Sequence, residues 1–407
     1  MPTGTASQSK PPRTSAARRT PAPQAKPVRT ADKGNTVYAA RLARVQQSLR
    51  EAHGDANAVG CFLITNPTDV GYCTGFLGGD SYIVLPHEGS NGKPVIVSDF
   101  RYDEELQPLR AFCDIHIRKG GILDAVGAIL AEHNATSCAF QADHLTVAEH
   151  EAFTAIARKG GCKLLPTKGL IARLRAVKDA SEVALIRGAI KIQEAALKAI
   201  LPTLKPGQSE LSIAAALESE MKRRGSGTPA FETIIAARAN GSLPHYRPGP
   251  VKTAATQPLL IDWGAVNQGY RGDMTRTFAF GKWPAKVAEI YDIVLEAHQR
   301  AAAGLKAGVS TREIDTLARG YIAKHGYGPQ FGHGLGHGLG LNTHEGPRLH
   351  HLPSADEPLQ AGMVVTIEPG IYLPGIGGVR IEDDYLVTKS GNENLSTLPK
   401  SRAWATL

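Results

Sequence analysis

The feature that most constrains the fold is a run of alternating glycines in the second half of the chain. In FGHGLGHGLGLNTHEG (331–346), glycine occupies every second position from 332 to 340. Each glycine costs a helix about 1 kcal/mol, so we expect an extended segment in which His333 and His337 share one face. The opposite face carries only glycine, which admits a ligand or another backbone at close range. We expect His344 to reach the same place across a turn.

Four acidic residues stand at or beside apolar, strand-like runs. Asp262 closes PLLID, and Asp273 lies eleven residues later in RGDMTRTF, which predicts a hairpin around the turn GAVNQGYRG. Glu368 ends the run VVTIE, and Glu382 lies in VRIEDDYLV, beyond the turn YLPGIGG. A single strand carboxylate is usually a surface charge. Four in this arrangement predict two neighbouring hairpins that each present two carboxylates to one cavity.

Carboxylates that share a cavity repel one another unless cations neutralise them. Two divalent ions balance four such charges, and a bound hydroxide completes the cluster. Oxygen and imidazole ligands without a thiolate suit manganese, cobalt, iron or zinc. Two such ions about 3.5–4 Å apart hold a bridging water, lower its pKa towards ~7 and polarise a carbonyl. The residues therefore predict hydrolysis.

Length and composition exclude several classes of protein. A chain of 407 residues predicts two or three domains, and no stretch approaches the ~18 apolar residues of a membrane span. The five cysteines form no C-x-x-C pair, which excludes a disulfide scaffold and predicts buried thiols in a reducing compartment. We therefore expect a cytoplasmic protein without a membrane partner.

The net charge of +8 is concentrated at the amino terminus. Residues 1–36 hold seven Lys and Arg against one Asp, so residues 37–407 carry only +2. This near-neutral body lacks the basic footprint of a nucleic-acid-binding protein. The first 36 residues are rich in Pro, Ala, Thr and Ser, lack the apolar core of a secretory signal, and are predicted to be a disordered basic tail.

The rest of the chain divides into two patterns. Residues 37–172 alternate helix and strand patterns and predict a small α/β domain. Its strands are expected in CFLITN, DSYIVLP, PVIVSDF and CAFQA, with turn-rich GYCTGFLGGD after the first and helices at 37–53, 121–136 and 146–158. In the second domain, 173–400, the clearest helix runs from Asp179, whose capping box is completed by Glu182, to Leu201. Further helices are expected at 209–224, 285–305 and 311–325.

The ordered motifs resemble those of a known family. DWGA with GDMTRT, HGLGHGLGLNTHE, TIEPG and RIED are together similar to the pita-bread metallopeptidases, and among them to the Xaa-Pro aminopeptidases and Xaa-Pro dipeptidases. NPTDVGYCTGF (66–76) and RAVKDASEVALIR (175–187) extend the resemblance over roughly residues 38–390. It implies an α+β protein: a creatinase-like amino-terminal α/β domain, then a pita-bread catalytic domain of curved antiparallel sheet with flanking helices.

The resemblance also implies a role for each motif residue. Asp262 would bind one metal, His337 and Glu368 the other, and Asp273 and Glu382 both. Glu368 would also act as general base or acid. The remaining implied residues contact the substrate or its surroundings: His344 at the scissile carbonyl, His245 in SLPHYRPG at the intermediate, His333 in the substrate pocket, and Arg380 behind the bridging carboxylates and beside the substrate.

The function implied is cleavage, by a metal-bridging water, of the bond between an amino-terminal residue and proline. Aminopeptidase and dipeptidase both remain open. The resemblance further implies two divalent ions, manganese ahead of cobalt, zinc or iron, a homodimer, and peptide substrates with proline in second position. One alternative is a same-fold hydrolase or lyase acting on a small non-peptide substrate. A second, a non-enzymatic module whose tail holds nucleic acid, is disfavoured because no metal ligand is missing.

Overall fold

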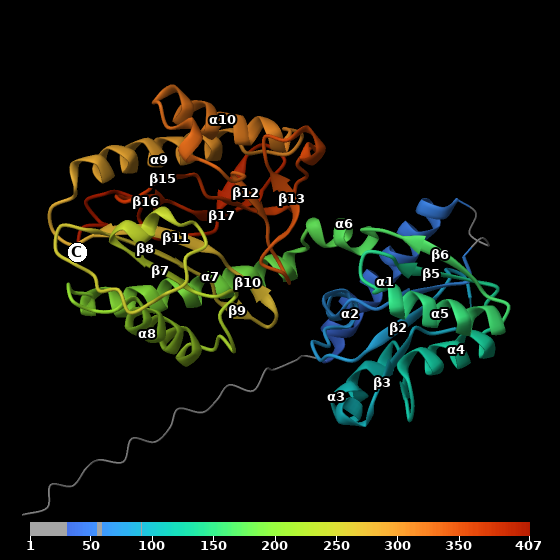
Figure 1. The fold of residues 1–407 in the computed structure, drawn as a ribbon. Helices are drawn as coiled ribbons and strands as arrows, with labels where there is room; N and C mark the ends of the chain where they lie inside the picture. Colours follow the sequence, from blue (N-terminus) through green and yellow to red (C-terminus); the bar gives the residue numbers. More distant parts are fainter. Residues whose placement is uncertain (1–30, 55–58, 91) are drawn as a thin grey trace, which may run out of the picture.

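The computed structural model describes residues 31–54, 59–90 and 92–407 (Figure 1). Helix α1 (Ala31–His53) opens the described chain, so it begins earlier than the predicted start at residue 37. The rest of the predicted disordered tail, residues 1–30, lies outside the described residues. In the part of the chain that is described, no helix is both long enough and apolar enough to cross a lipid bilayer.

The amino-terminal part is built on a six-stranded mixed sheet with the order β4-β3-β2-β1-β5-β6. Its strands are β1 (Cys61–Ile64), β2 (Tyr82–Pro86), β3 (Val95–Ser98), β4 (Asp114–Ile117), β5 (Ser137–Gln141) and β6 (Lys163–Thr167). Helices α4 (Ile122–Glu132) and α5 (Val147–Lys159) cover one face, while α1 and α2 (Pro67–Thr74) cover the other (Figure 1). Because both faces are covered, every residue of β1 is buried. A short helix, α3 (Asp103–Leu106), follows β3.

Helix α2 corrects the prediction of turns after the first strand. The GYCT of the turn-rich segment lies inside this helix. The side chain of Asn66 accepts a hydrogen bond from the Thr68 N–H, Pro67 occupies the first turn, and Gly75 ends the helix at φ 74°. These are ordinary boundary signals around an eight-residue helix, and burial of its side chains in the core outweighs the weak helix propensity of its glycine and threonines.

All five cysteines are buried and form no disulfide bond, as the sequence predicts. Their role is packing: Cys61, Cys138 and Cys162 lie in the core between the sheet and α4 and α5. Burial raises the pKa of the Cys113 thiol to about 12, which keeps it protonated and unreactive.

Two helices below and two above enclose the strands of the second half (Figure 1). These are α7 (Ala180–Ile200) and α8 (Glu210–Arg223) on one side and α9 (Ala285–Gly304) and α10 (Thr311–Lys324) on the other. The capping box predicted at the start of α7 is present, with Asp179 and Glu182 bonded reciprocally. Helix α6 (Leu170–Ala176) connects the two parts, and the predicted boundary at 172/173 falls inside it.

The strands of the second half pair only antiparallel among themselves. A three-stranded sheet comprises β7 (Ile234–Ala237), β8 (Pro258–Trp263) and β11 (Met274–Ala279). A five-stranded sheet comprises β12 (Gly336–Gly338), β13 (Glu345–Leu349), β14 (Val364–Ile367), β17 (Asp383–Val387) and β18 (Asn392–Asn394). Two-stranded ribbons are β9 (Val266–Asn267) with β10 (Tyr270–Arg271) and β15 (Gly370–Leu373) with β16 (Gly377–Arg380). The predicted α+β class is confirmed.

The two predicted carboxylate hairpins form, but the second is divided. In the first, β8 and β11 pair with Asp262 opposite Thr275. In the second, β14 pairs with β17 and β15 pairs with β16, so Glu368 and Glu382 stand where the chain passes from one sheet to the other. Pro369 has no N–H to donate to a ladder, which explains the break at this point.

The chain beyond the predicted end of the second domain also packs onto it. The Leu407 N–H donates to the carbonyl of Ala279 near the end of β11, and the Ala279 N–H donates to the carbonyl of Ala405. The rings of Phe278 and Trp404 lie 5.5 Å apart. Residues 401–407 therefore continue the structure of the second half.

Candidate active site

All predicted site side chains line one cavity of about 430 Å³. They are Asp262, Asp273, His337, Glu368, Glu382, His245, His333, His344 and Arg380. The carboxylates come from the ends of strands in both sheets, whereas His245 and His344 come from loops. Residues separated by more than 100 positions in the sequence meet in one place because β11 lies beside the segment that joins β16 to β17, where the Glu382 N–H donates to the carbonyl of Thr275.

The predicted metal ligands form a close, buried cluster. Ligand atoms of Asp273, His337 and Glu382 lie within 4.8 Å of one another. The Nε2 atom of His337 lies 3.4 Å from Oε1 of Glu368 and 3.8 Å from Oδ2 of Asp273. His337 presents this nitrogen to the carboxylates because its Nδ1 lies 3.1 Å from the carbonyl oxygen of Gly338.

Burial and mutual repulsion shift the pKa of every group in this cluster. Desolvation and the neighbouring acids raise the pKa of Asp273 and Glu368 well above their ordinary values and that of Glu382 to about 8. Desolvation also lowers the pKa of His337 to about 3, so its imidazole is neutral at physiological pH. Such a site favours a cation strongly, because a cation removes the repulsion and uses the neutral imidazole as a ligand.

The residues fit the two divalent ions implied by the sequence. Oδ1 of Asp262 is buried and makes no hydrogen bond within the described residues, although buried acceptors are normally satisfied. Its Oδ2 accepts a bond from Arg380, so the free oxygen is the one available to an ion. The donor set of carboxylate oxygens and one imidazole matches manganese, cobalt, iron and zinc.

Arg380 orders the wall behind the cluster through a different contact from the one expected. Its guanidinium donates to Oδ2 of Asp262 at 2.5 Å, not to either predicted bridging carboxylate. It also donates to Oγ1 of Thr275 at 3.0 Å, and this hydroxyl donates to Oε2 of Glu382 at 2.6 Å. A third bond reaches the hydroxyl of Tyr372 at 2.9 Å. Arg380 thus reaches Glu382 only through Thr275.

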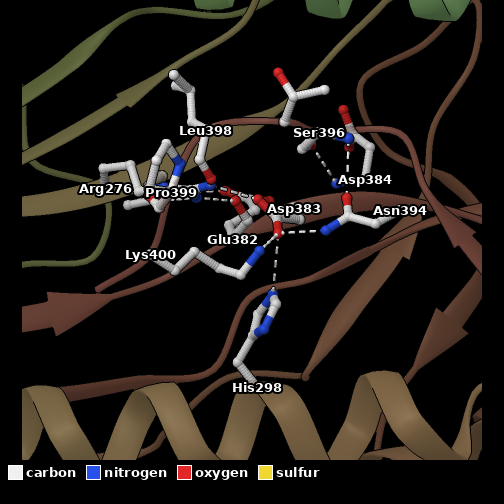
Figure 2. Close-up of polar contacts among 12 residues, drawn as sticks. Arg276, His298, Glu382, Asp383, Asp384, Asn394, Ser396, Leu398, Pro399 and Lys400 are labelled. Atoms are coloured by element: carbon white, nitrogen blue, oxygen red, sulfur yellow. Dashed lines mark hydrogen bonds and ion pairs between the residues drawn. The ribbon is translucent and has the colours of Figure 1, made fainter. Parts of the chain in front are cut away.

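Behind the cluster, a fully buried arginine joins the strands that carry Asp273 and Glu382 (Figure 2). The guanidinium of Arg276 donates to the carbonyl of Glu382 at 2.6 Å and to the carboxylate of Asp383 at 2.6 Å. It also donates to the carbonyls of Leu398 and Pro399. These bonds fix β11 to β17 and to the chain leading to the carboxyl terminus.

Asp383 is the counter-ion of this network (Figure 2). Its other oxygen accepts bonds from Asn394 at 2.9 Å and from the ammonium of Lys400. Burial disfavours the charged carboxylate, but Arg276, His298 and Lys400 outweigh it and hold the pKa of Asp383 below its ordinary value. The neighbouring Asp384 accepts a bond from the Asp273 N–H at 3.1 Å, which fixes the backbone of that ligand.

The loop that carries His245 is held by the buried Glu210 in the first turn of α8. One carboxylate oxygen accepts bonds from the Ala237 N–H and the Asn240 amide, at 2.8 and 2.9 Å. The other accepts bonds from the Tyr246 hydroxyl and the Gly249 N–H, at 2.8 and 3.0 Å. The carboxylate therefore ties together both ends of the segment containing His245.

The other two histidines have different surroundings. His333 contacts the Tyr372 hydroxyl through Nε2 at 2.9 Å, and burial together with Arg380 lowers its pKa to about 4. His344 is half-exposed, and its ring centroid lies 4.4 Å from that of His337. His344 therefore stands beside the cluster with room for a substrate in front of it.

Sequence reasoning missed Tyr372 and Glu210. Tyr372 lies in the segment interpreted as a turn, and Glu210 follows an N-cap serine, where an acid ordinarily complements the helix dipole. Neither position carries a periodic or motif signal. The cavity is also lined by Phe231 and Arg348, which no motif identified, and by Tyr246, which stands beside His245 in SLPHYRPG but was given no role. Trp263 and Tyr270 are buried in the core.

Sequence profiles of two families match the chain. The profile of metallopeptidase family M24 matches residues 184–389, and that of the creatinase/prolidase N-terminal domain matches residues 41–177. An uncharacterized peptidase of Bacillus subtilis, YqhT, is 35% identical over 354 residues, which cover 87% of this chain and 98% of that protein. The Xaa-Pro dipeptidase of Pyrococcus horikoshii is 42% identical over 227 residues, which cover 56% of this chain and 64% of that protein.

Solved structures of Xaa-Pro peptidases superpose on most of this chain. The Xaa-Pro dipeptidase from Bacillus anthracis superposes with a TM-score of 0.82 at 36% identity, covering 88% of this chain and 99% of that one. The X-Pro aminopeptidase from Thermotoga maritima superposes with a TM-score of 0.77 at 32% identity, covering 84% and 97%. The resemblance to the pita-bread peptidases and their fold is confirmed.

Proposed function

The chain belongs to metallopeptidase family M24, and on this basis we propose that it cleaves the peptide bond between an amino-terminal residue and proline with two divalent metal ions. It is a hydrolase of the Xaa-Pro peptidase type. The observation that supports the proposal best is the cluster of three buried acids and the partly buried Glu368 around His337. Such a cluster requires cations of about the charge that two divalent ions provide.

The proposed ligands are Asp262, Asp273, His337, Glu368 and Glu382. When bound, two divalent ions supply a water of lowered pKa and Lewis acidity toward the substrate carbonyl. We favour manganese as the physiological ion, with cobalt, zinc and iron as acceptable replacements. Arg380 fixes Asp262, and Thr275 fixes Glu382, so these carboxylates are oriented before any ion arrives.

Three side chains of the cavity provide proton transfer and orientation. Glu368, whose pKa burial and Glu382 raise well above the ordinary value, accepts the proton of the attacking water and returns it to the leaving proline nitrogen. His344 and His245 donate hydrogen bonds to the carbonyl oxygen as negative charge develops on it. Their place on anchored loops keeps this donor geometry fixed.

Recognition of proline has to rest on shape. The bond to proline is a tertiary amide without an N–H, so the site cannot use a backbone hydrogen bond there. Phe231 and Tyr246 supply aromatic surface on the cavity wall, and His333, held by Tyr372, completes it. We propose that the proline ring packs against this wall.

A metal-restoration experiment tests the proposal. The protein is stripped with a chelator, and Mn²⁺, Co²⁺ or Zn²⁺ is restored before hydrolysis of Ala-Pro, Ala-Pro-Ala-Ala and the matched peptide Ala-Ala-Ala-Ala is measured. We expect metal-dependent release of alanine from the proline peptides alone, lost in Asp273→Ala. Protein shown to hold two ions but unable to cleave either proline peptide would contradict the proposal and point to a small non-peptide substrate.

Several further assignments complete the proposal. We propose a boundary between an amino-terminal and a catalytic domain at α6, a homodimer as the working form, and a cytoplasmic location. Sedimentation of the purified protein tests the dimer, and fractionation of cells tests the location.

A further inference from the structure

Two groups of charged side chains connect the amino-terminal domain to the catalytic domain, and one of them ends beside His344. In the first group, Asp69 of α2 contacts Arg175 of α6, and Arg175 contacts Glu345, the residue that follows His344. The ammonium of Lys178 lies 3.0 Å from the second oxygen of Glu345. The four side chains are between 1% and 8% exposed and contribute two positive and two negative charges.

Asp69 is itself fixed by the amino-terminal sheet. Oδ1 of Asp69 accepts a bond from Arg175 at 2.9 Å, and Oδ2 accepts one from Gln141 at 2.5 Å. The amide oxygen of Gln141, at the end of β5, accepts bonds from the N–H groups of Thr65 and Asn66 just before α2. The carboxylate of Asp69 is therefore set in place by the end of β5 and by the segment that joins β1 to α2 in that domain.

Glu345 connects this chain of contacts to the loop of His344. A Cβ atom added at Gly340 would lie 2.3 Å from Oε1 of Glu345, so the alternating glycines leave the space that this side chain fills. The same loop has a second contact with the amino-terminal domain, because the Thr68 hydroxyl donates to the side-chain oxygen of Asn342 at 3.1 Å. Helix α6 lies between the two parts where these contacts meet (Figure 1).

We propose that the amino-terminal domain positions His344 for the reaction through the contacts Asp69–Arg175–Glu345, which makes these three residues positioning residues. The inference rests on the proposed function, because it takes His344 to be the group that contacts the substrate carbonyl. The amino-terminal domain then contributes to the chemistry of the site from a distance, through a neutral group of four buried charges.

The other group of charges provides a control. Arg41 of α1 donates to Asp179 at 2.8 Å and lies 3.6 Å from Glu182, whose other oxygen accepts a bond from Tyr270. This group also joins the two domains, and none of its members lines the cavity or contacts Glu345. Arg41→Met therefore weakens the contact between the domains without removing any contact of Glu345.

A double-mutant cycle with His344→Ala tests the proposal. Asp69→Asn removes the charge that Arg175 balances, and we expect kcat/KM on Ala-Pro to fall about tenfold to a hundredfold, since small displacements of catalytic groups have effects of this size. In the His344→Ala background the same substitution should have almost no further effect. Arg41→Met should change the rate by the same small factor in both backgrounds. A loss from Asp69→Asn that persists fully without His344 overturns the proposal.

Hydrogen exchange gives a second readout that needs no activity. In Asp69→Asn, the backbone amides of residues 340–346 should exchange faster than in the parent protein, whereas Arg41→Met should leave them unchanged. Unaltered exchange in this segment would contradict the proposal. Arg175→Lys, which keeps the positive charge but loses the forked contact with Asp69 and Glu345, supplies both measurements if Asp69→Asn fails to fold. Absence of peptide cleavage in the parent protein would instead refute the proposed function.

Discussion

The two walls of the cavity are held in place by different means. The carboxylate wall consists of strand ends, and β8, β11 and β17 fix it through backbone ladders and the buried pair Arg276–Asp383. The histidine wall consists of loops around His245 and His344. The first loop is fixed by the buried Glu210 of α8, and the second by the side chain of Glu345, the residue after His344, which contacts Arg175 and Lys178.

This difference follows from what a backbone can do by itself. A strand next to a strand satisfies its own N–H and C=O groups, so its side chains inherit a fixed direction. A loop lacks such a ladder, so a carboxylate that accepts several hydrogen bonds holds the loop in its place. The carboxylates of this protein therefore serve two purposes: four face the cavity as proposed ligands, and others lie behind it as anchors.

The largest effect is expected from removing a proposed ligand on the carboxylate wall. Asp273→Ala should abolish metal-dependent cleavage and lower the number of ions bound per chain. A carboxylate oxygen of Asp273 lies within 4.8 Å of the ligand atoms of both His337 and Glu382. Peptide assays and metal analysis of the purified variant measure both. Full activity with two bound ions would show that Asp273 is not a ligand.

Removing the counter-ion behind the same wall should chiefly affect stability. Asp383→Ala leaves Arg276 and Lys400 buried without their partner, and breaking a buried pair in this way costs about 3–5 kcal/mol. Chemical denaturation of the metal-free protein measures this. Arg187→Met, which breaks the exposed pair with Glu393, is the control and should cost less than ~1 kcal/mol. Similar losses in both variants would contradict the role given to the buried network.

On the histidine wall, the anchor of the His245 loop should affect both rate and stability. Glu210→Gln replaces one acceptor oxygen by a donor, so at least two of the four bonds are lost, at a cost of about 1–3 kcal/mol. We expect kcat to fall more than KM changes, because His245 acts on the developing charge. Glu218→Gln on the same helix serves as the control. A lower stability with an unchanged kcat would mean that the loop holds His245 without this acid.

A pH experiment separates the buried network from the rest of the carboxylate wall. Burial lowers the pKa of His298 from 6.5 to about 3, so between these values the unfolded chain binds a proton that the folded chain does not. Stability therefore falls as the pH drops from 6.5, by about 1.4 kcal/mol per pH unit for this group. His298→Phe should flatten the dependence, and His325→Phe at an exposed position should not. Equal slopes in all three proteins would contradict the assignment.

The smallest effect is expected at the rim of the cavity. Arg348 lines it, and within the described residues its guanidinium forms no ion pair with a carboxylate. A dipeptide would place its terminal carboxylate within the cavity, whereas a longer peptide extends out of it. Arg348→Ala should therefore raise KM for Ala-Pro by about twofold to fivefold and change that for Ala-Pro-Ala-Ala less. An equal change in KM for both peptides would show that Arg348 takes no part in selecting peptides by length.

The sequence alone determined many of the elements of this protein and the family to which it belongs. Alternation placed Asp262 and Asp273 on one hairpin, spaced glycines excluded a helix around His337, and the capping box located α7, because these are local properties of the backbone. The helix around Tyr72 and the break at Pro369 were missed, since helix propensity is weak there and the division of a hairpin between two sheets depends on distant strands.

Only the tertiary structure decided which residues hold the site in place. Glu210, Tyr372, Arg276 and the contacts from Asp69 to Glu345 join positions from different elements, and each of these residues alone has the appearance of an ordinary polar residue in the sequence. Their importance comes from burial, which makes a satisfied charge or hydrogen bond stabilising and an unsatisfied one costly. Burial depends on the packing of the whole chain, and no local pattern encodes it.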